Sequence, residues 1–111
     1  MTLESNDVRF LDALRRDLRA DLASSVRRVA VLGSKARGDA KVDSDLDVLV
    51  ILADDAPPDA KRRVQDVVAD SAMATEVDAG VVVYRESAWR DAVASGRYFQ
   101  RAVERDAVAV D

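Results

Sequence analysis

Two aspartates in the stretch "DSDLDVLVIL" have the type and spacing that metal chemistry requires. Asp45 and Asp47 are two positions apart at the head of an apolar run, and such residues point to the same face of a β-strand. Two carboxylates held roughly 5 Å apart repel by about 3 kcal/mol at an effective dielectric constant near 20. Asp78, at the head of another apolar run, adds a third carboxylate. Because Mg²⁺ binds such carboxylates together with phosphate oxygens, the three residues are predicted to form a metal site.

An EF-hand calcium loop does not explain this acidic pattern. Counted from Asp43, such a loop needs glycine at its sixth position and glutamate at its twelfth. The chain has Val48 and Asp54 at these positions, and the second half of the loop would be the apolar run itself.

The pair Gly33-Ser34 is separated from Asp45 by ten residues and follows a short apolar run. Glycine allows close approach of the backbone, and the first amides of a turn after a strand face outward toward an anion. The Ser34 hydroxyl adds a donor for a phosphate oxygen. A phosphate cradle beside a metal site predicts a nucleoside-triphosphate site, in which Mg²⁺ bridges phosphate and carboxylate.

Two basic residues follow this turn. Lys35 or Arg37 would neutralise further phosphate charge. An ion pair of Arg37 with Asp39 or Asp43 explains that arginine equally well, and Asp43 itself is expected to be solvated or to form a turn.

The spacing of apolar residues predicts the elements that position these side chains. Helices are expected over 6–23, 59–73, 87–95 and 98–105, a helical turn over 34–38, and strands over 29–32, 45–52, 76–84 and 107–110. This order favours an α/β (α+β) fold, a small mixed β-sheet flanked by helices, in one domain over residues 1–111. The large residues Trp89, Tyr98 and Phe99 are expected to pack in the core, with a patch that faces a partner protein as the alternative.

Composition excludes several classes of chemistry. The 111 residues contain no cysteine and no histidine, which removes thiol and imidazole catalysis, disulfides and structural zinc. The net charge of −4 argues against a nucleic-acid-binding protein with a basic face. No signal peptide is evident and the longest apolar run, Val48 to Ala53, is too short to cross a bilayer. A cytoplasmic protein without direct nucleic-acid or membrane binding is expected.

The motif Gly-Ser, ten residues, Asp-x-Asp resembles the signature of the minimal nucleotidyltransferase (MNT) family of the DNA polymerase β-like superfamily, and "GSKARGDAKVDSDLDVLV" is similar to the family's wording around it. The resemblance implies a nucleotidyltransferase fold with ATP as substrate. Asp45 and Asp47 would hold two Mg²⁺ ions, and Asp78 would complete the metal site and accept a proton as general base. Gly33, Ser34 and Arg37 would bind the nucleotide.

Small members of this family resemble antitoxins of toxin–antitoxin pairs whose partner is a HEPN-domain ribonuclease toxin. The resemblance implies transfer of AMP from ATP to a toxin hydroxyl, a tyrosine in some members. No segment is expected to remain for a domain that grips the acceptor, so a partner protein is expected to present it. Two alternatives stay open: an antitoxin that acts only by binding and masking the toxin, and a small-molecule nucleotidyltransferase completed by a partner subunit.

Overall fold

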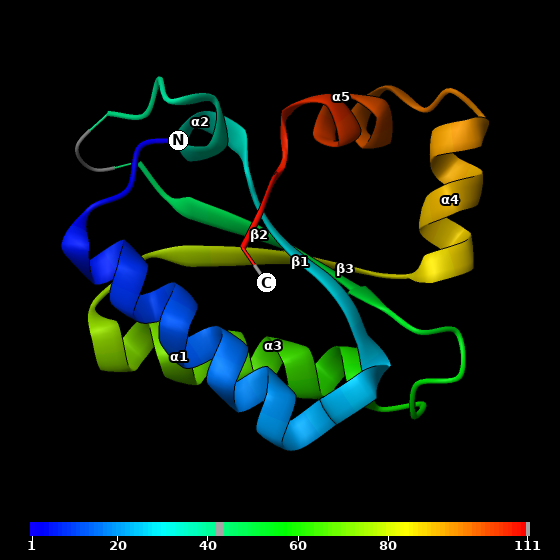
Figure 1. The fold of residues 1–111 in the computed structure, drawn as a ribbon, viewed down its shortest axis with the longest axis horizontal. Helices are drawn as coiled ribbons and strands as arrows, with labels where there is room; N and C mark the ends of the chain where they lie inside the picture. Colours follow the sequence, from blue (N-terminus) through cyan, green and yellow to red (C-terminus); the bar gives the residue numbers. More distant parts are fainter. Residues whose placement is uncertain (42–43, 111) are drawn as a thin grey trace.

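The computed structural model describes residues 1–41 and 44–110, and the expected helices and strands are present in it (Figure 1). Asp43, expected to be solvated or part of a turn, lies outside the described residues. The elements in chain order are α1 (Ser5–Leu22), a 3-10 turn (Ala23–Ser25), β1 (Val26–Leu32), α2 (Gly33–Arg37), β2 (Leu46–Leu52), α3 (Ala60–Thr75), β3 (Ala79–Arg85), α4 (Glu86–Ala94), α5 (Tyr98–Asp106) and β4 (Val108–Ala109).

Two strand starts differ by three residues from the sequence prediction, and the other strand boundaries agree within one residue. β1 begins at Val26, three residues earlier than expected. Its first half is less apolar, but Val26 and Arg28 still pair with β2. β3 begins at Ala79 rather than at Glu76, because Glu76 takes the left-handed φ of 57° that ends α3. An apolar run marks the buried part of a strand, whereas hydrogen bonding decides its length.

The four strands form one mixed sheet in the order β3-β2-β1-β4. β1 is antiparallel to β2 and to β4, whereas β2 and β3 are parallel and joined by a crossover through α3. This arrangement confirms the expected fold class, a small mixed sheet flanked by helices.

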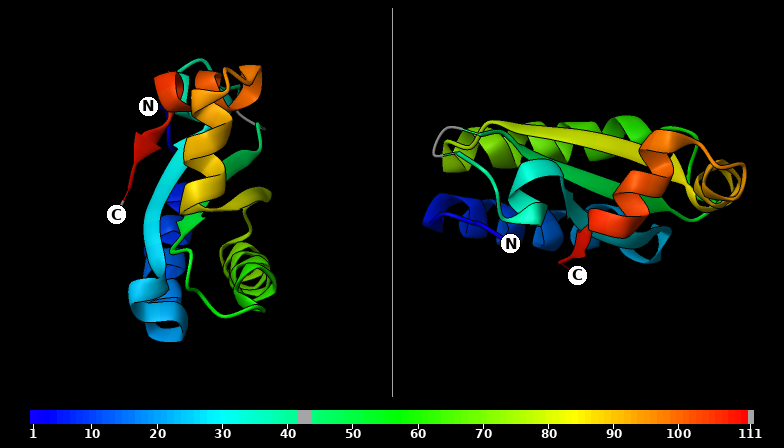
Figure 2. Two further views of the ribbon diagram at one scale, coloured as in Figure 1. Left: turned by 90° about the vertical axis from the view of Figure 1, so that its right-hand side faces the viewer. Right: turned by 90° about the horizontal axis from the view of Figure 1, so that it is seen from above.

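One face of the sheet holds the main core. Side chains from alternate positions of β2 are fully buried on this face, where they meet the apolar sides of α1 and α3: Leu46, Val48, Val50 and Leu52. Each fully buried side chain of this kind stabilises the fold by about 1.5–3 kcal/mol. Figure 1 shows α1 and α3 together below the sheet, and Figure 2 shows the same layer from two further sides.

The opposite face carries a smaller core and the aspartates. Leu49 and Ile51 of β2 pack there with Trp89 of α4 and Val103 of α5. Asp45 and Asp47 precede them on the same face, since they continue the alternation toward the start of the strand. α4 and α5 therefore cover one part of this face and leave the acidic end open.

Trp89 is a core residue, as expected, with 5% of its surface exposed. The same expectation was wrong for its neighbours: Tyr98 is 86% exposed and Phe99 47%. α5 begins at Tyr98 and turns Gln100 and Val103 inward, which leaves the two aromatic side chains of its first turn outside the core.

No helix in the described ranges has the length and apolar character that a membrane-spanning segment requires.

Candidate active site

The Asp47 carboxylate lies between two glycines. In the sheet, Asp47 on the central strand β2 is paired with Leu32 at the end of β1 and with Gly80 on β3. A Cβ built on Gly80 would lie 2.8 Å from Asp47 Oδ1, and one built on Gly33 would lie 3.6 Å from Asp47 Oδ2. Gly80 is not among the glycines with positive φ, so its backbone would accept other residues. The missing side chain at Gly80 provides space for the carboxylate.

Asp45 and Asp47 form the expected like-charge pair. Asp47 is exposed, but the surrounding protein removes part of the water from its carboxylate. The pKa of Asp47 is therefore raised above its ordinary value of 3.8, first because of this desolvation and second because Asp45 lies nearby. Among residues 1–41 and 44–110, no lysine or arginine forms an ion pair with Asp45, Asp47 or Asp78. The fold thus holds two adjacent carboxylates without supplying a counter-charge for them.

Strand register places Asp78 beside Asp45. The carbonyl oxygen of Asp78 accepts a hydrogen bond from the amide of Leu46 at 2.9 Å, and the pairs Leu46–Ala79 and Asp47–Gly80 follow directly. Asp78 is exposed, and the alternation along the chain puts it on the face that carries Asp45 and Asp47. In the described parts of the chain, no three acidic side chains are gathered closely enough to hold a metal ion as they stand. Strand register therefore brings the backbones of Asp45, Asp47 and Asp78 close together, whereas their three carboxylates do not meet around one point.

Gly33 and Ser34 form the turn from β1 into α2. Gly33 has a φ of +69°, a left-handed conformation that favours glycine, and it places the first residue of α2 against Asp47. The carbonyl of Ser34 accepts the amides of Gly38 and Asp39 at the other end of this short helix. The Ser34 hydroxyl has no hydrogen-bond partner in the described part of the protein. The turn predicted from sequence is therefore present, with its hydroxyl available.

Lys35 does not face this site, which corrects one of the two expectations for the basic residues. Its side chain is buried, and its Nζ lies 2.5 Å from Asp7 Oδ2. The same carboxylate oxygen accepts the backbone amide of Glu4 at 2.9 Å. Lys35 therefore fastens α2 to the start of α1, and this contact between segments far apart in sequence leaves no signal in the motif.

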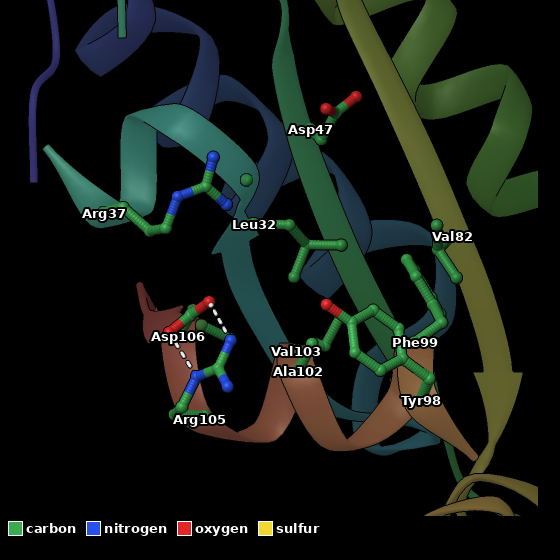
Figure 3. Close-up of a pocket in the computed structure, with 12 residues that line it drawn as sticks. Leu32, Arg37, Asp47, Val82, Tyr98, Phe99, Ala102, Val103, Arg105 and Asp106 are labelled. Carbon is green, nitrogen blue, oxygen red and sulfur yellow. Dashed lines mark hydrogen bonds and ion pairs between the residues drawn. The ribbon is translucent and has the colours of Figure 1, made fainter. Parts of the chain in front are cut away.

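Arg37 is exposed, and its position allows both roles left open for it, an ion pair with an aspartate and a contact with phosphate. Its Nε lies 3.3 Å from Asp39 Oδ2, which confirms the ion pair with Asp39. The residue also lines a cavity that contains Asp47, as Figure 3 shows. A surface ion pair of this kind contributes about 0–1 kcal/mol, so it leaves Arg37 free to exchange partners.

The cavity has a volume of about 490 Å³ and lies between β2, α2 and α5 (Figure 3). Its walls are Leu32, Gly33, Arg37, Asp47, Val82, Tyr98, Phe99, Ala102, Val103, Arg105, Asp106 and Ala107. The pKa of Asp106 is lowered, mainly by its hydrogen bond with Arg105 and to a smaller degree by the positive charge of Arg37. Half of the lining residues belong to α5. The sequence did not predict that α5 contributes to the site, because only its packing on the sheet brings this helix close to the aspartates.

The nucleotidyltransferase domain family model matches residues 10–101, which is most of the chain. The chain belongs to this family. A solved structure with a similar fold is that of a proposed nucleotidyltransferase from Sulfolobus solfataricus, with a TM-score of 0.49, 17% sequence identity, and alignment over 97% of this chain and 87% of that one. No curated protein matches this nucleotidyltransferase-domain chain significantly.

Proposed function

We propose that this nucleotidyltransferase-domain protein transfers AMP from ATP to a hydroxyl group of a partner protein, and that it acts as the antitoxin of a HEPN-type ribonuclease toxin. The observation that carries the transferase part is the position of Asp47, held between Gly33 and Gly80 with Asp45 beside it. In a member of this family, that arrangement joins the Gly-Ser turn to the Asp-x-Asp pair.

The chemistry of the residues present fits Mg²⁺, although the three carboxylates would have to turn toward one another to hold the two ions of this proposal. The donor set consists of carboxylates, which are hard oxygen ligands, and within the described residues no lysine or arginine forms an ion pair with them. Asp45 and Asp47 would hold the ions, and Asp78 would complete the set from the neighbouring strand. Bound Mg²⁺ supplies charge stabilisation for the attacking and leaving oxygens of an in-line displacement.

The remaining steps belong to side chains and amides of this chain. Ser34 and the amides beside Gly33 bind the outer phosphates, and Arg37 contributes positive charge at the same turn. The acceptor oxygen attacks the α-phosphorus, the bond from that phosphorus to the bridging oxygen breaks, and pyrophosphate leaves. Asp78 accepts the proton of the acceptor hydroxyl as general base. The product is an adenylylated hydroxyl, a tyrosine of the toxin in this proposal.

The exposure of the acidic residues supports an acceptor that arrives from outside. Asp45 and Asp78 are both exposed at the end of the sheet that α4 and α5 leave uncovered. A hydroxyl on the surface of a docked protein reaches such residues without any opening of the fold.

The test uses α-labelled ATP and Mg²⁺, with a candidate HEPN toxin added as the acceptor. Wild type is compared with the double variant Asp45→Ala/Asp47→Ala and with Asp55→Ala, a matched control because Asp55 is exposed and lies beyond the other end of β2. The proposal predicts label on the toxin, located by mass spectrometry, for wild type and Asp55→Ala only. Label on small molecules would instead indicate a small-molecule transferase. Full neutralisation of the toxin by the double variant would indicate an antitoxin that acts by masking.

A further inference from the structure

The first turn of α5 presents two neighbouring aromatic side chains outside the core. Tyr98 is 86% exposed and Phe99 is 47% exposed, yet both line the cavity that contains Asp47. Figure 3 shows the Tyr98 ring leaning over this cavity with its hydroxyl directed inward, and Phe99 beside Val82 of β3. Exposed aromatic surface is costly in water, and its position at the rim of a cavity indicates a ligand.

The cavity has two chemically different ends. Asp47, Gly33 and Arg37 form a polar end, and the ion pair of Arg105 with Asp106 adds charge to the wall near Arg37. Val82 and Val103 form an apolar end beneath the aromatic pair. A volume of about 490 Å³ lies within the range of small-molecule sites, about 300–1,000 Å³. A ligand that fills both ends needs a polar group at one side, which can be anionic when a cation is bound at Asp47, and a flat, apolar group at the other.

From this we propose that Tyr98 and Phe99 form the nucleobase subsite of the nucleotide, with the base stacked at the apolar end while the phosphates lie at the polar end. The inference rests on the proposed function, because it places a further part of the same substrate. Every base has a π face, and aromatic side chains stack on such faces. The larger ring system of a purine covers more of the aromatic pair, so ATP and GTP bind more tightly than CTP and UTP.

The test separates the base from the phosphates. Isothermal titration calorimetry with Mg²⁺ compares two probes: α,β-methylene ATP, which cannot release pyrophosphate, and tripolyphosphate, which has no base. Phe99→Ala and Tyr98→Ala are expected to weaken binding of α,β-methylene ATP by about 5- to 150-fold, the range for loss of aromatic–base stacking. Both variants are expected to leave the affinity for tripolyphosphate unchanged. Tyr98→Phe keeps the ring and is expected to bind like wild type.

Met73→Ala is the matched control, because Met73 is also an exposed apolar residue, at 84%, but lies on α3 and does not line this cavity. It is expected to leave both affinities unchanged. Equal weakening of both probes by the aromatic variants, or unchanged affinity for the nucleotide, would overturn the base subsite alone. If wild type binds neither probe, the nucleotide site itself is wrong and the base subsite falls with it.

Discussion

Gly80→Ala adds one methyl group directly in front of the Asp47 carboxylate. The new Cβ would lie 2.8 Å from Oδ1, and ordinary contact begins at 3.4 Å, so the carboxylate must withdraw by about 0.6 Å. Changes that disturb the support of a metal-binding carboxylate typically cost about 10- to 100-fold in affinity or activity. Gly80→Ala is therefore expected to weaken Mg²⁺-dependent binding of α,β-methylene ATP by about 10- to 100-fold, or about 1.4–2.7 kcal/mol.

The same substitution should leave the fold intact. The backbone at Gly80 is compatible with alanine, which stabilises such positions by about 0.4–1 kcal/mol through the unfolded state, and the displaced atom is the end of a flexible side chain. The free energy of unfolding in urea is expected to change by less than about 1 kcal/mol. Val81→Ala is the matched control, because Val81 lies on the opposite face and packs against the main core. It is expected to lower the free energy of unfolding by about 1–2 kcal/mol and to leave the nucleotide affinity unchanged. Wild-type affinity in Gly80→Ala would show that metal and nucleotide binding does not depend on the position of the Asp47 carboxylate.

Three further predictions concern single side chains. Asp47→Asn is expected to raise the free energy of unfolding at pH 7, because the raised pKa of Asp47 means that its ionised form costs more in the folded than in the unfolded chain. Its gain over wild type in urea denaturation should shrink as the pH falls through the raised pKa toward 3.8, and a gain that grows on acidification would contradict the assigned cause. Lys35→Met leaves the buried Asp7 without its counter-charge and is expected to cost about 3–5 kcal/mol in the same assay, with partial recovery when Asp7→Asn is added; a cost under about 1 kcal/mol would show that the pair is not buried in solution. Gly33→Ala is expected to cost about 1–2 kcal/mol because of the φ of +69°, and unchanged stability would mean that the turn takes another conformation.

Local patterns predicted most of the fold. The alternation along β2 was sufficient to place Asp45 and Asp47 on one face and Leu46, Val48 and Val50 on the other, because side chains of a strand alternate whatever its neighbours are. The helices followed from the spacing of apolar residues in the same way. Strand ends were less accurate, since Glu76 belongs to the end of α3 through its left-handed φ.

Contacts between distant segments could not be predicted. The space that Gly80 leaves for Asp47 depends on the register of β3 against β2, which no residue of either strand specifies alone. Lys35 is buried because it pairs with Asp7, which lies 28 positions away in the sequence. The motif around Lys35 therefore could not indicate that this lysine is buried. Tyr98 and Phe99 were expected in the core because aromatic residues are usually buried, whereas the packing of α5 leaves them at the cavity.

We propose that Asp45, Asp47 and Asp78 together hold metal ions against a nucleotide bound at the Gly33-Ser34 turn. A crystal structure with Mn²⁺ and α,β-methylene ATP tests it most directly, because anomalous scattering locates the metal independently of the nucleotide. We expect all three carboxylates to coordinate Mn²⁺, with the triphosphate beside Ser34. Metal bound elsewhere, or an Asp78 side chain turned away from a metal held by Asp45 and Asp47, would contradict it.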